Sequence, residues 1–234
     1  MADLKPEKPA ENGADEKADP VQEAEDLKMS RGPRKEADVN FEKLKELYVY
    51  DELGNKIRFS DVYRKQKTII VMTRHLLDFI TKEYVEDLAI IPLEYLQEAE
   101  TRLVVIGPAP FKFIKPFRKV TNYQYTMYCD PDGELYKAMG CMFKMACGPL
   151  DKCKHVKSGV ISGFMKSMWR AMQYQEYQGD PKQQGASFIM GPGDVVHFSH
   201  IDESASDHVD INDLLEAAGV QKVSFPKDQR VLTV

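Results

Sequence analysis

The 234-residue chain has four cysteines and a single tryptophan, and it lacks several features that would assign a class at once. No run of about 18 apolar residues occurs, so we expect no membrane span. The opening residues, MADLKPEKPAENGADEK, contain no apolar segment, which argues against a secretory signal. Few cysteines without such a signal favour reduced thiols, so we expect a cytoplasmic protein without a disulfide framework.

A surplus of basic side chains is also missing. The formal net charge is −5 at pH 7, which argues against a protein that binds nucleic acid in bulk. Residues 1–40 carry 11 acidic and 7 basic side chains and no aromatic ring. A segment of this composition buries too little apolar surface to offset its ordering entropy. We therefore predict a disordered acidic tail over 1–40 and a folded domain over 41–234.

From residue 41 onward, strand and helix patterns alternate along the chain. Short β-branched apolar runs such as TIIVMT indicate buried strands, and glycine-containing turns separate the strands of two expected hairpins. We expect strands within 48–59 (two, around a Gly-Asn turn), 68–73, 101–107, 125–129 and 185–200 (two, around Gly-Pro-Gly), and helices at 60–65, 78–89, 92–99, 111–120, 133–140 and 211–219. This order predicts an α/β protein with a thioredoxin-like fold, in which helices flank a central mixed sheet.

The junction TRHLLDFITKEYVEDL, at 73–88, leads from a buried strand straight into a helix. Asp78 stands at the expected helix start. Aspartate is a favoured N-cap because its carboxylate accepts backbone N–H groups and complements the helix dipole. The plainest interpretation of Asp78 is therefore a cap. A general base is the alternative, although the sequence names no electrophile or acid partner for it.

Five separated segments, in order, resemble a known family: RHLLDFITKEYVEDLAIIP, RLVVIG, YCDPDGELYK, MWRA at 168–171, and GDPKQQGASFIMGPGDVVHFSH. From about residue 47 to 234 the chain resembles the peroxiredoxin-like 2 family, within it the AhpC/TSA antioxidant enzyme domain-containing branch (peroxiredoxin-like 2C). The resemblance implies a thioredoxin-like fold and an antioxidant or oxidoreductase activity. It also implies a Cys-x-x-Cys pair at the start of the helix that follows the strand.

The chain departs from that pattern at the two cysteine positions, which are Asp78 and Thr81. Neither side chain can form a disulfide, and a carboxylate is not a thiolate nucleophile. We therefore expect no thiol peroxidase chemistry at this helix start. The resemblance places these pocket neighbours around the two positions: Arg74, His75, Phe79, Lys82 and Gly185.

Two of these neighbours raise separate questions. Gly185 stands where thioredoxin-like folds usually place a cis-proline, and glycine allows the backbone to approach the helix start closely. His75 is either a half-buried, hydrogen-bonded histidine or a ligand of the pocket. Two later histidines, His197 and His200, fall in the last expected hairpin, and we assign them no role.

Displaced sulfurs are the alternative source of redox chemistry. Cys141, Cys147 and Cys153 follow one another at six-residue intervals, with His155 close behind. Nearby lysines would lower the pKa of these thiols. Plain reduced thiols, a reversible redox loop and a metal site are all open interpretations, but the tight Cys-x2-Cys spacing of metal sites is missing. We expect no metal and no cofactor.

Two classes of function remain open. In the first, a peroxiredoxin-like protein without thiol peroxidase activity acts by binding or regulation, with a groove near Asp78, Phe79 and Gly185 that recognises an unidentified protein or small-molecule partner. In the second, an antioxidant oxidoreductase uses the displaced cysteines. Loss of both cysteines at the helix start favours the first class, and the loop with three cysteines favours the second.

The acidic tail generates the first test. Removing residues 1–40 should leave the melting temperature nearly unchanged. The segment has no aromatic side chain and few apolar ones, so it buries little surface. Differential scanning calorimetry of the full chain and the truncated chain measures the difference. A drop of many degrees would show that the tail packs on the domain.

Overall fold

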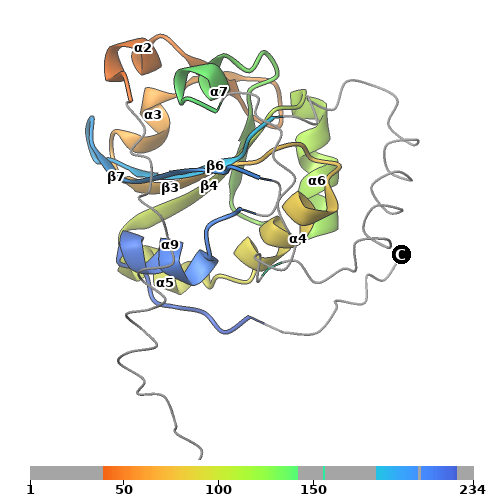
Figure 1. The fold of residues 1–234 in the computed structure, drawn as a ribbon, viewed down its shortest axis with the longest axis vertical. Helices are drawn as coiled ribbons and strands as arrows, with labels where there is room; N and C mark the ends of the chain where they lie inside the picture. Colours follow the sequence, from red (N-terminus) through yellow and green to blue (C-terminus); the bar gives the residue numbers. More distant parts are fainter. Residues whose placement is uncertain (1–38, 142–154, 156–182, 205–206, 226–234) are drawn as a thin grey trace, which may run out of the picture. The chain divides into compact units, whose positions relative to one another are not determined.

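The computed structural model describes residues 39–141, 155, 183–204 and 207–225 (Figure 1). All of them belong to one compact unit that spans Lys35–Val234. Within the described residues, seven strands form one sheet in the order β2-β1-β5-β4-β3-β6-β7. The strands are β1 (Tyr48–Tyr50), β2 (Lys56–Arg58), β3 (Lys67–Met72), β4 (Thr101–Gly107), β5 (Thr126–Cys129), β6 (Ala186–Met190) and β7 (Val196–Ile201).

The sheet is mixed, as the sequence predicts. Strand β3 pairs in parallel with β4, which pairs in parallel with β5. The remaining pairs are antiparallel: β1 with β2 and β5, and β6 with β3 and β7. The parallel centre and the antiparallel hairpin at its edge confirm the thioredoxin-like fold class.

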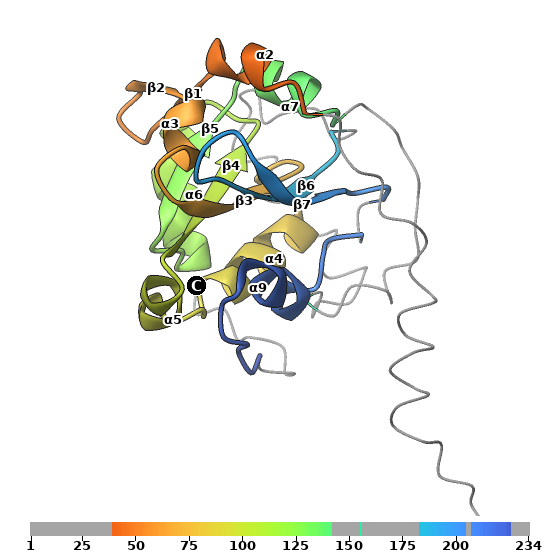
Figure 2. The same ribbon diagram turned by 90° about the vertical axis from the view of Figure 1, so that its left-hand side faces the viewer.

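Helices cover both faces of the sheet. They are α2 (Phe41–Lys45), α3 (Ser60–Tyr63), α4 (Phe79–Leu88), α5 (Leu93–Glu98), the 3-10 turn η1 (Phe111–Phe113), α6 (Ile114–Thr121), α7 (Glu134–Ala138) and α9 (Ile211–Ala218). Figures 1 and 2 show α2, α3 and α7 over one face and α4, α5 and α9 over the other. The sequence analysis missed only the short helix α2 among these.

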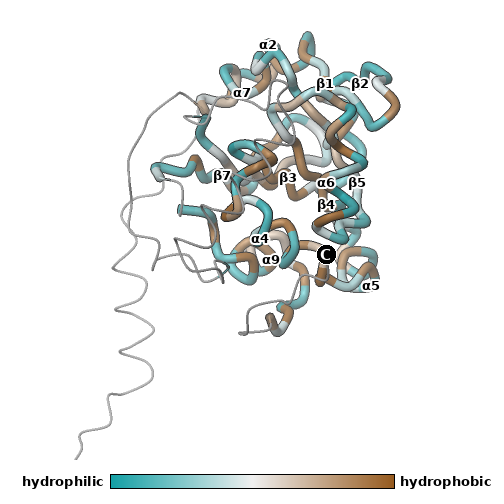
Figure 3. The backbone as a smooth tube through the Cα atoms, turned by 90° about the vertical axis from the view of Figure 1, so that its right-hand side faces the viewer, coloured by the Kyte–Doolittle hydropathy of each residue, from teal (hydrophilic) through white to brown (hydrophobic). Residues whose placement is uncertain are grey.

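Alternation along the central strand divides the core into two parts. Ile69 and Val71 of β3 pack toward α4, α5, α6 and α9, whereas Ile70 and Met72 pack toward α2, α3 and α7. Successive side chains of a strand point to opposite faces, so an unbroken apolar run is needed where both faces are covered. Figure 3 shows the hydrophobic colour along β3 and β4.

The side chain of Tyr136, from α7, contacts the carboxyl ends of the central strands β3 and β4, and Asp130 holds the start of α7 in place. The Tyr136 hydroxyl lies within hydrogen-bond distance of two carbonyl oxygens, to either of which it can donate. One belongs to Thr73, just beyond β3, at 2.7 Å, and the other to Ile106 of β4, at 2.8 Å. The Asp130 carboxylate accepts the backbone N–H groups of Leu135 and Tyr136 at 2.9 and 3.2 Å. The edge of the sheet from which α4 departs is therefore fixed by contacts from the opposite face.

The folded part begins slightly earlier than the sequence boundary. Asn40 is the N-cap of α2 and accepts the Lys43 N–H at 3.1 Å, and Val39 packs against the core beneath α2. A truncation after residue 38 therefore tests the tail without removing a helix cap. No helix among the described residues is both long and apolar enough to cross a membrane.

Candidate functional site

The start of α4 is built around the carboxylate of Asp78. Asp78 is the N-cap, and its Oδ2 atom accepts the backbone N–H of Thr81 at 3.3 Å and the Thr81 hydroxyl at 3.2 Å. The residue is only 8% exposed. The cap expected from the sequence is thus present, and the positive end of the helix dipole already faces an anion supplied by the chain.

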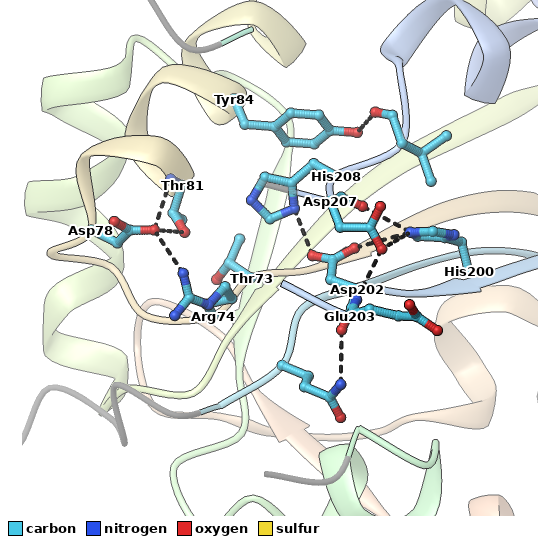
Figure 4. A network of polar contacts seen from close by, with 12 residues as sticks. Thr73, Arg74, Asp78, Thr81, Tyr84, His200, Asp202, Glu203, Asp207 and His208 are labelled. Atoms are coloured by element: carbon cyan, nitrogen blue, oxygen red, sulfur yellow. Dashed lines mark hydrogen bonds and ion pairs between the residues drawn. The ribbon is translucent and has the colours of Figure 1, made fainter. Parts of the chain in front are cut away.

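Arg74 joins this helix start to a distant segment (Figure 4). Its Nη1 atom lies 3.6 Å from Oδ2 of Asp78, and its Nε–H donates to the carbonyl oxygen of Gln183 at 3.3 Å. The guanidinium therefore neutralises the buried carboxylate and ties it to the residues that lead into β6. Charge at the α4 start is balanced within the protein.

The sequence analysis expects the backbone at Gly185 to approach the start of α4. The backbone does make a close approach there, but to Asp202, Met72 and Arg74. A Cβ atom built on it would lie 2.4 Å from Oδ2 of Asp202, 3.0 Å from the carbonyl oxygen of Met72 and 3.4 Å from Cγ of Arg74. Any larger residue would displace one of these groups. Gly185 therefore lets the end of β3 and Asp202 approach one another.

The other predicted pocket neighbours differ in burial and in whether their side chains are already paired. Phe79 and Lys82 are buried, and the Lys82 ammonium forms an ion pair with Glu86 one turn along α4. His75 is half-buried beside Arg74. Lys82 is therefore engaged within the helix, which leaves Asp78, Thr81 and Arg74 as the polar centre of the α4 start.

Cys141 does not have the environment of a reactive thiol. It is 2% exposed, and burial raises its pKa, assisted by the negative charge of Asp202. The expectation that lysines lower the pKa is wrong for this residue. Cys129 is buried as expected, and burial raises its pKa to about 12. Cys147 and Cys153 lie outside the described residues.

No group of three metal-ligating side chains occurs among the residues that the structure describes. A surface hollow of about 510 Å3 lies elsewhere, between α6 and Glu52, and is lined by Lys115, Lys119 and other polar side chains. Its Arg118 is already bonded to Glu52 at 2.8 Å and to the carbonyl oxygens of Tyr123 and Gln124 at 3.1 Å each. None of its lining residues belongs to the α4 start, so the hollow is separate from that site.

A second polar cluster, which the sequence analysis missed, lies between β7 and α9. Asp202 is 1% exposed, and its Oδ2 atom is 2.6 Å from Nδ1 of His208. Nε2 of His200 bonds to the carbonyl oxygen of Asp207 at 2.8 Å and lies 3.5 Å from the other Asp202 oxygen and 3.4 Å from Oδ2 of Asp207. The density of histidine and aspartate over 200–208 was the available signal, and His200, to which we assigned no role, belongs to this cluster.

The charges of this cluster shift its pKa values. Burial opposes the charged form of His200, but the hydrogen bond to Asp207 and the charges of Asp202 and Asp207 outweigh it and raise the His200 pKa. Burial likewise opposes the charged form of Asp207, but its bonds to His200 and to the Glu203 N–H lower the Asp207 pKa. An imidazolium at 200 and a carboxylate at 207 therefore stabilise each other in the fold.

His155, which follows the cysteine loop, has a structural contact instead of a metal-binding one. Its Nδ1 atom lies 2.8 Å from Oδ2 of the fully buried Asp87, and its Nε2 atom accepts the backbone N–H of Ile211 at 3.2 Å. Since Nε2 accepts, the ring proton is on Nδ1 and points to Asp87. This neutral histidine joins α4 to the first turn of α9.

Comparison with known proteins places the chain in a family. A family model described as AhpC/TSA antioxidant enzyme matches residues 92–204. Peroxiredoxin-like 2C of Bos taurus is 42% identical over 191 residues, which cover 81% of this chain and 84% of the relative. The chain belongs to the peroxiredoxin-like 2 family. Peroxiredoxin-like 2C of Homo sapiens is 41% identical over 191 residues, with 81% and 84% coverage.

Among solved structures, peroxidoxin BcpB of Mycobacterium tuberculosis aligns with a TM-score of 0.46 and 16% identity, covering 74% of this chain and 88% of that chain. The peroxiredoxin-like 2 assignment confirms the resemblance seen in the sequence. The roles of individual residues, including Asp78 and Thr81 at the family's cysteine positions, stay predictions.

Replacing Asp78 by alanine tests its role as the cap of α4 in this peroxiredoxin-like 2 chain. Asp78→Ala should lower the free energy of unfolding by about 0.5–2 kcal/mol, the usual range for loss of a favoured N-cap. Asp78→Asn keeps an acceptor oxygen and should lose less. Urea unfolding of the three proteins measures both differences. Equal losses for Ala and Asn would indicate that the charge opposite Arg74, and not the cap, is what matters.

Protonation of His200 should make stability depend on pH. Because the pKa of His200 is raised in the fold, its stabilising contribution is fully present below the unfolded value of about 6.5 and is lost as pH rises through the higher folded value. The lowered pKa of Asp207 acts in the opposite direction, since its contribution is lost only in acid, as pH falls through the folded value. The difference in unfolding free energy between the wild type and His200→Gln should therefore shrink as pH rises from about 6 toward 9.

Urea unfolding across this pH range measures the difference. His197→Gln is the matched control, because His197 lies on the same strand and its Nε2 atom bonds to the carbonyl oxygen of Gly191 at 2.7 Å, away from both aspartates. A His200→Gln difference that stays constant with pH would show that the imidazolium does not pair with Asp207.

Proposed function

We propose that this peroxiredoxin-like protein lacks thiol peroxidase activity at the start of α4 and acts there by binding a protein or small-molecule partner. The observation that carries the proposal is the state of Asp78. Its carboxylate occupies the helix N-terminus, is held by Thr81 and is neutralised by Arg74. A thiolate in the same place would be stabilised by the same amides and the same guanidinium. The scaffold therefore keeps the electrostatics of a redox site around a group that cannot form a disulfide.

The rest of the described site supports recognition over redox chemistry. Cys141, the one displaced cysteine that the structure describes, is buried with a raised pKa, so little of it exists as the reactive thiolate. Its burial counts against the alternative of an antioxidant oxidoreductase that uses displaced cysteines. We also propose a cytoplasmic location, in keeping with free cysteines at 129 and 141.

A peroxide-consumption assay tests the proposal directly. The wild type, supplied with hydrogen peroxide and dithiothreitol as reductant, should consume peroxide no faster than the reductant alone, because the α4 start offers no sulfur. Any activity that does appear should disappear when Cys141, Cys147 and Cys153 are replaced together by serine. Peroxide reduction by the wild type at the rate of a thiol peroxidase would overturn the proposal.

The double variant Asp78→Cys with Thr81→Cys is the positive control. Both cysteines would occupy the first turn of α4, where the helix dipole lowers thiol pKa values. The first introduced thiol should therefore titrate below about 8.5 in pH-dependent alkylation. The pair should form a disulfide that dithiothreitol reduces. An ordinary thiol pKa and no disulfide would show that this helix start does not have the electrostatics of a redox site.

A further inference from the structure

The stretch from residue 101 to residue 129 carries positive charge only. It contains five basic side chains and no aspartate or glutamate, although the whole chain has a formal net charge of −5. The five are Arg102, Lys112, Lys115, Arg118 and Lys119. Three of them belong to helix α6, so this helix is basic in a protein that is acidic as a whole.

The surface hollow of about 510 Å3 lies between this helix and the turn that joins β1 to β2. Arg118 fixes its shape, because each of the three guanidinium nitrogens is already used. Nη1 donates to Glu52 of the turn at 2.8 Å, and Nε and Nη2 donate to the carbonyl oxygens of Tyr123 and Gln124 at 3.1 Å each. Glu52, the one acidic residue of the lining, is therefore paired with Arg118.

Two cations of the lining are left without such a pair. Lys115 and Lys119 are exposed, and neither forms an ion pair with any residue that the structure describes. Lys115 lies in the first turn of α6, where the positive end of the helix dipole disfavours a cation. Lys119 follows one turn later on the same side of the helix, so the two like charges repel each other. The stability of the helix therefore does not account for this placement.

Exposed apolar side chains stand on the same two segments. Leu53, which is 67% exposed, follows Glu52 in the turn, and Val120, which is 48% exposed, follows Lys119. The ring of Phe111, just before α6, packs against Gly54 of the turn, so closely that a Cβ atom built there would lie 3.0 Å from it. Three of the five large apolar side chains that are exposed among the described residues thus belong to the segments that form the hollow.

This combination fits a polypeptide better than a small molecule. Small-molecule sites are lined mostly by apolar groups with a few polar ones. Here the lining is charged and polar, and the apolar side chains belong to the neighbouring positions of the chain. Exposed apolar groups beside polar ones are typical of surfaces that bind other proteins.

We propose that this hollow is a docking surface for an acidic segment of a partner protein. Carboxylates of that segment pair with Lys115 and Lys119, and an apolar side chain of the segment packs against Leu53 or Phe111. Charge complementarity gives the location: a chain of net charge −5 repels an acidic partner over most of its surface, which directs that partner to the unpaired lysines. The surface is separate from the α4 start, so the inference does not depend on the function proposed there.

The probe is a fluorescein-labelled octapeptide with the sequence Glu-Glu-Leu-Glu-Glu-Phe-Glu-Glu, titrated with the full chain and followed by fluorescence anisotropy. It should bind saturably, and the affinity should fall as sodium chloride is added, because exposed charge pairs are screened by salt. A peptide with glutamine at every glutamate position should bind more weakly, and so should one with serine at the two apolar positions.

A variant pair tests the lysines. Lys115→Gln with Lys119→Gln should weaken binding of the acidic peptide by about two- to thirtyfold, the range for loss of two exposed ion pairs, and should flatten its salt dependence. Lys43→Gln with Lys65→Gln is the matched control, because both lysines are exposed, lie outside the hollow and change the net charge equally. Equal weakening by the two pairs would show that only the overall charge matters and would overturn the inference.

A second variant tests the apolar contact. Leu53→Ser should weaken binding and leave the salt dependence in place, whereas Leu93→Ser, at an exposed leucine of α5, should leave the affinity unchanged. The inference is overturned if the acidic peptide does not bind saturably, or if the glutamine peptide binds as tightly. Inorganic phosphate and phosphatidylserine vesicles are tested in parallel, and binding of either to the two lysines without binding of the peptide would assign the hollow to a phosphate group instead.

These outcomes are independent of the peroxide assay. All the variants leave Asp78, Thr81 and Arg74 in place, so a wild type that reduced peroxide would overturn the proposed function alone. Loss of the peptide response would overturn the docking surface alone.

Discussion

Burial of strand β3 from Thr68 to Met72 is the constraint on which the rest of the structure depends. It pairs with β4 on one side and β6 on the other, and its residues from Thr68 to Met72 are buried. Helices must cover both faces of such a strand, and the chain must leave it at a point where polar groups can be satisfied. That point is Thr73, whose carbonyl oxygen the Tyr136 hydroxyl contacts and whose N–H donates to Ile106. The position of the α4 start is therefore set by the point at which the chain leaves β3.

Buried charge at this exit is balanced locally. Asp78 has Thr81 and Arg74 as partners, and Asp202 has His208 and His200. A buried carboxylate without such partners would be strongly unfavourable. The arrangement also weakens the attraction of the α4 N-terminus for anions. Since Asp78 already occupies the positive end of the α4 dipole, an anion from outside the chain would gain little there.

The parts of this structure that depend on local pattern could be predicted from the sequence, whereas the parts that depend on long-range contacts could not. Asp78 as a cap is indicated by a strand run, an aspartate and a helix pattern in succession, and the order of these runs indicates the sheet. The contact of His155 with Asp87 joins residues 68 positions apart, and no local pattern specifies it. Lysines near Cys141 in sequence suggested a lowered thiol pKa, but burial, which depends on the packing of α7 and β6, reverses the direction. Helix α2 is too short to show a full apolar period.

The two histidine–aspartate pairs beside α4 differ in what the second ring nitrogen of each histidine contacts. Each pair brings Nδ1 of a histidine close to a buried carboxylate, and each ring packs against Tyr84 of α4. The difference lies in how each ring is placed relative to the start of α9. Ile211 begins this helix, whose first N–H groups lack partners within the helix, and one of them reaches Nε2 of His155. His208 lies before that helix start and receives no such donor among the described residues. Where a first-turn N–H of α9 reaches the second ring nitrogen, as in His155, the histidine stabilises the helix terminus.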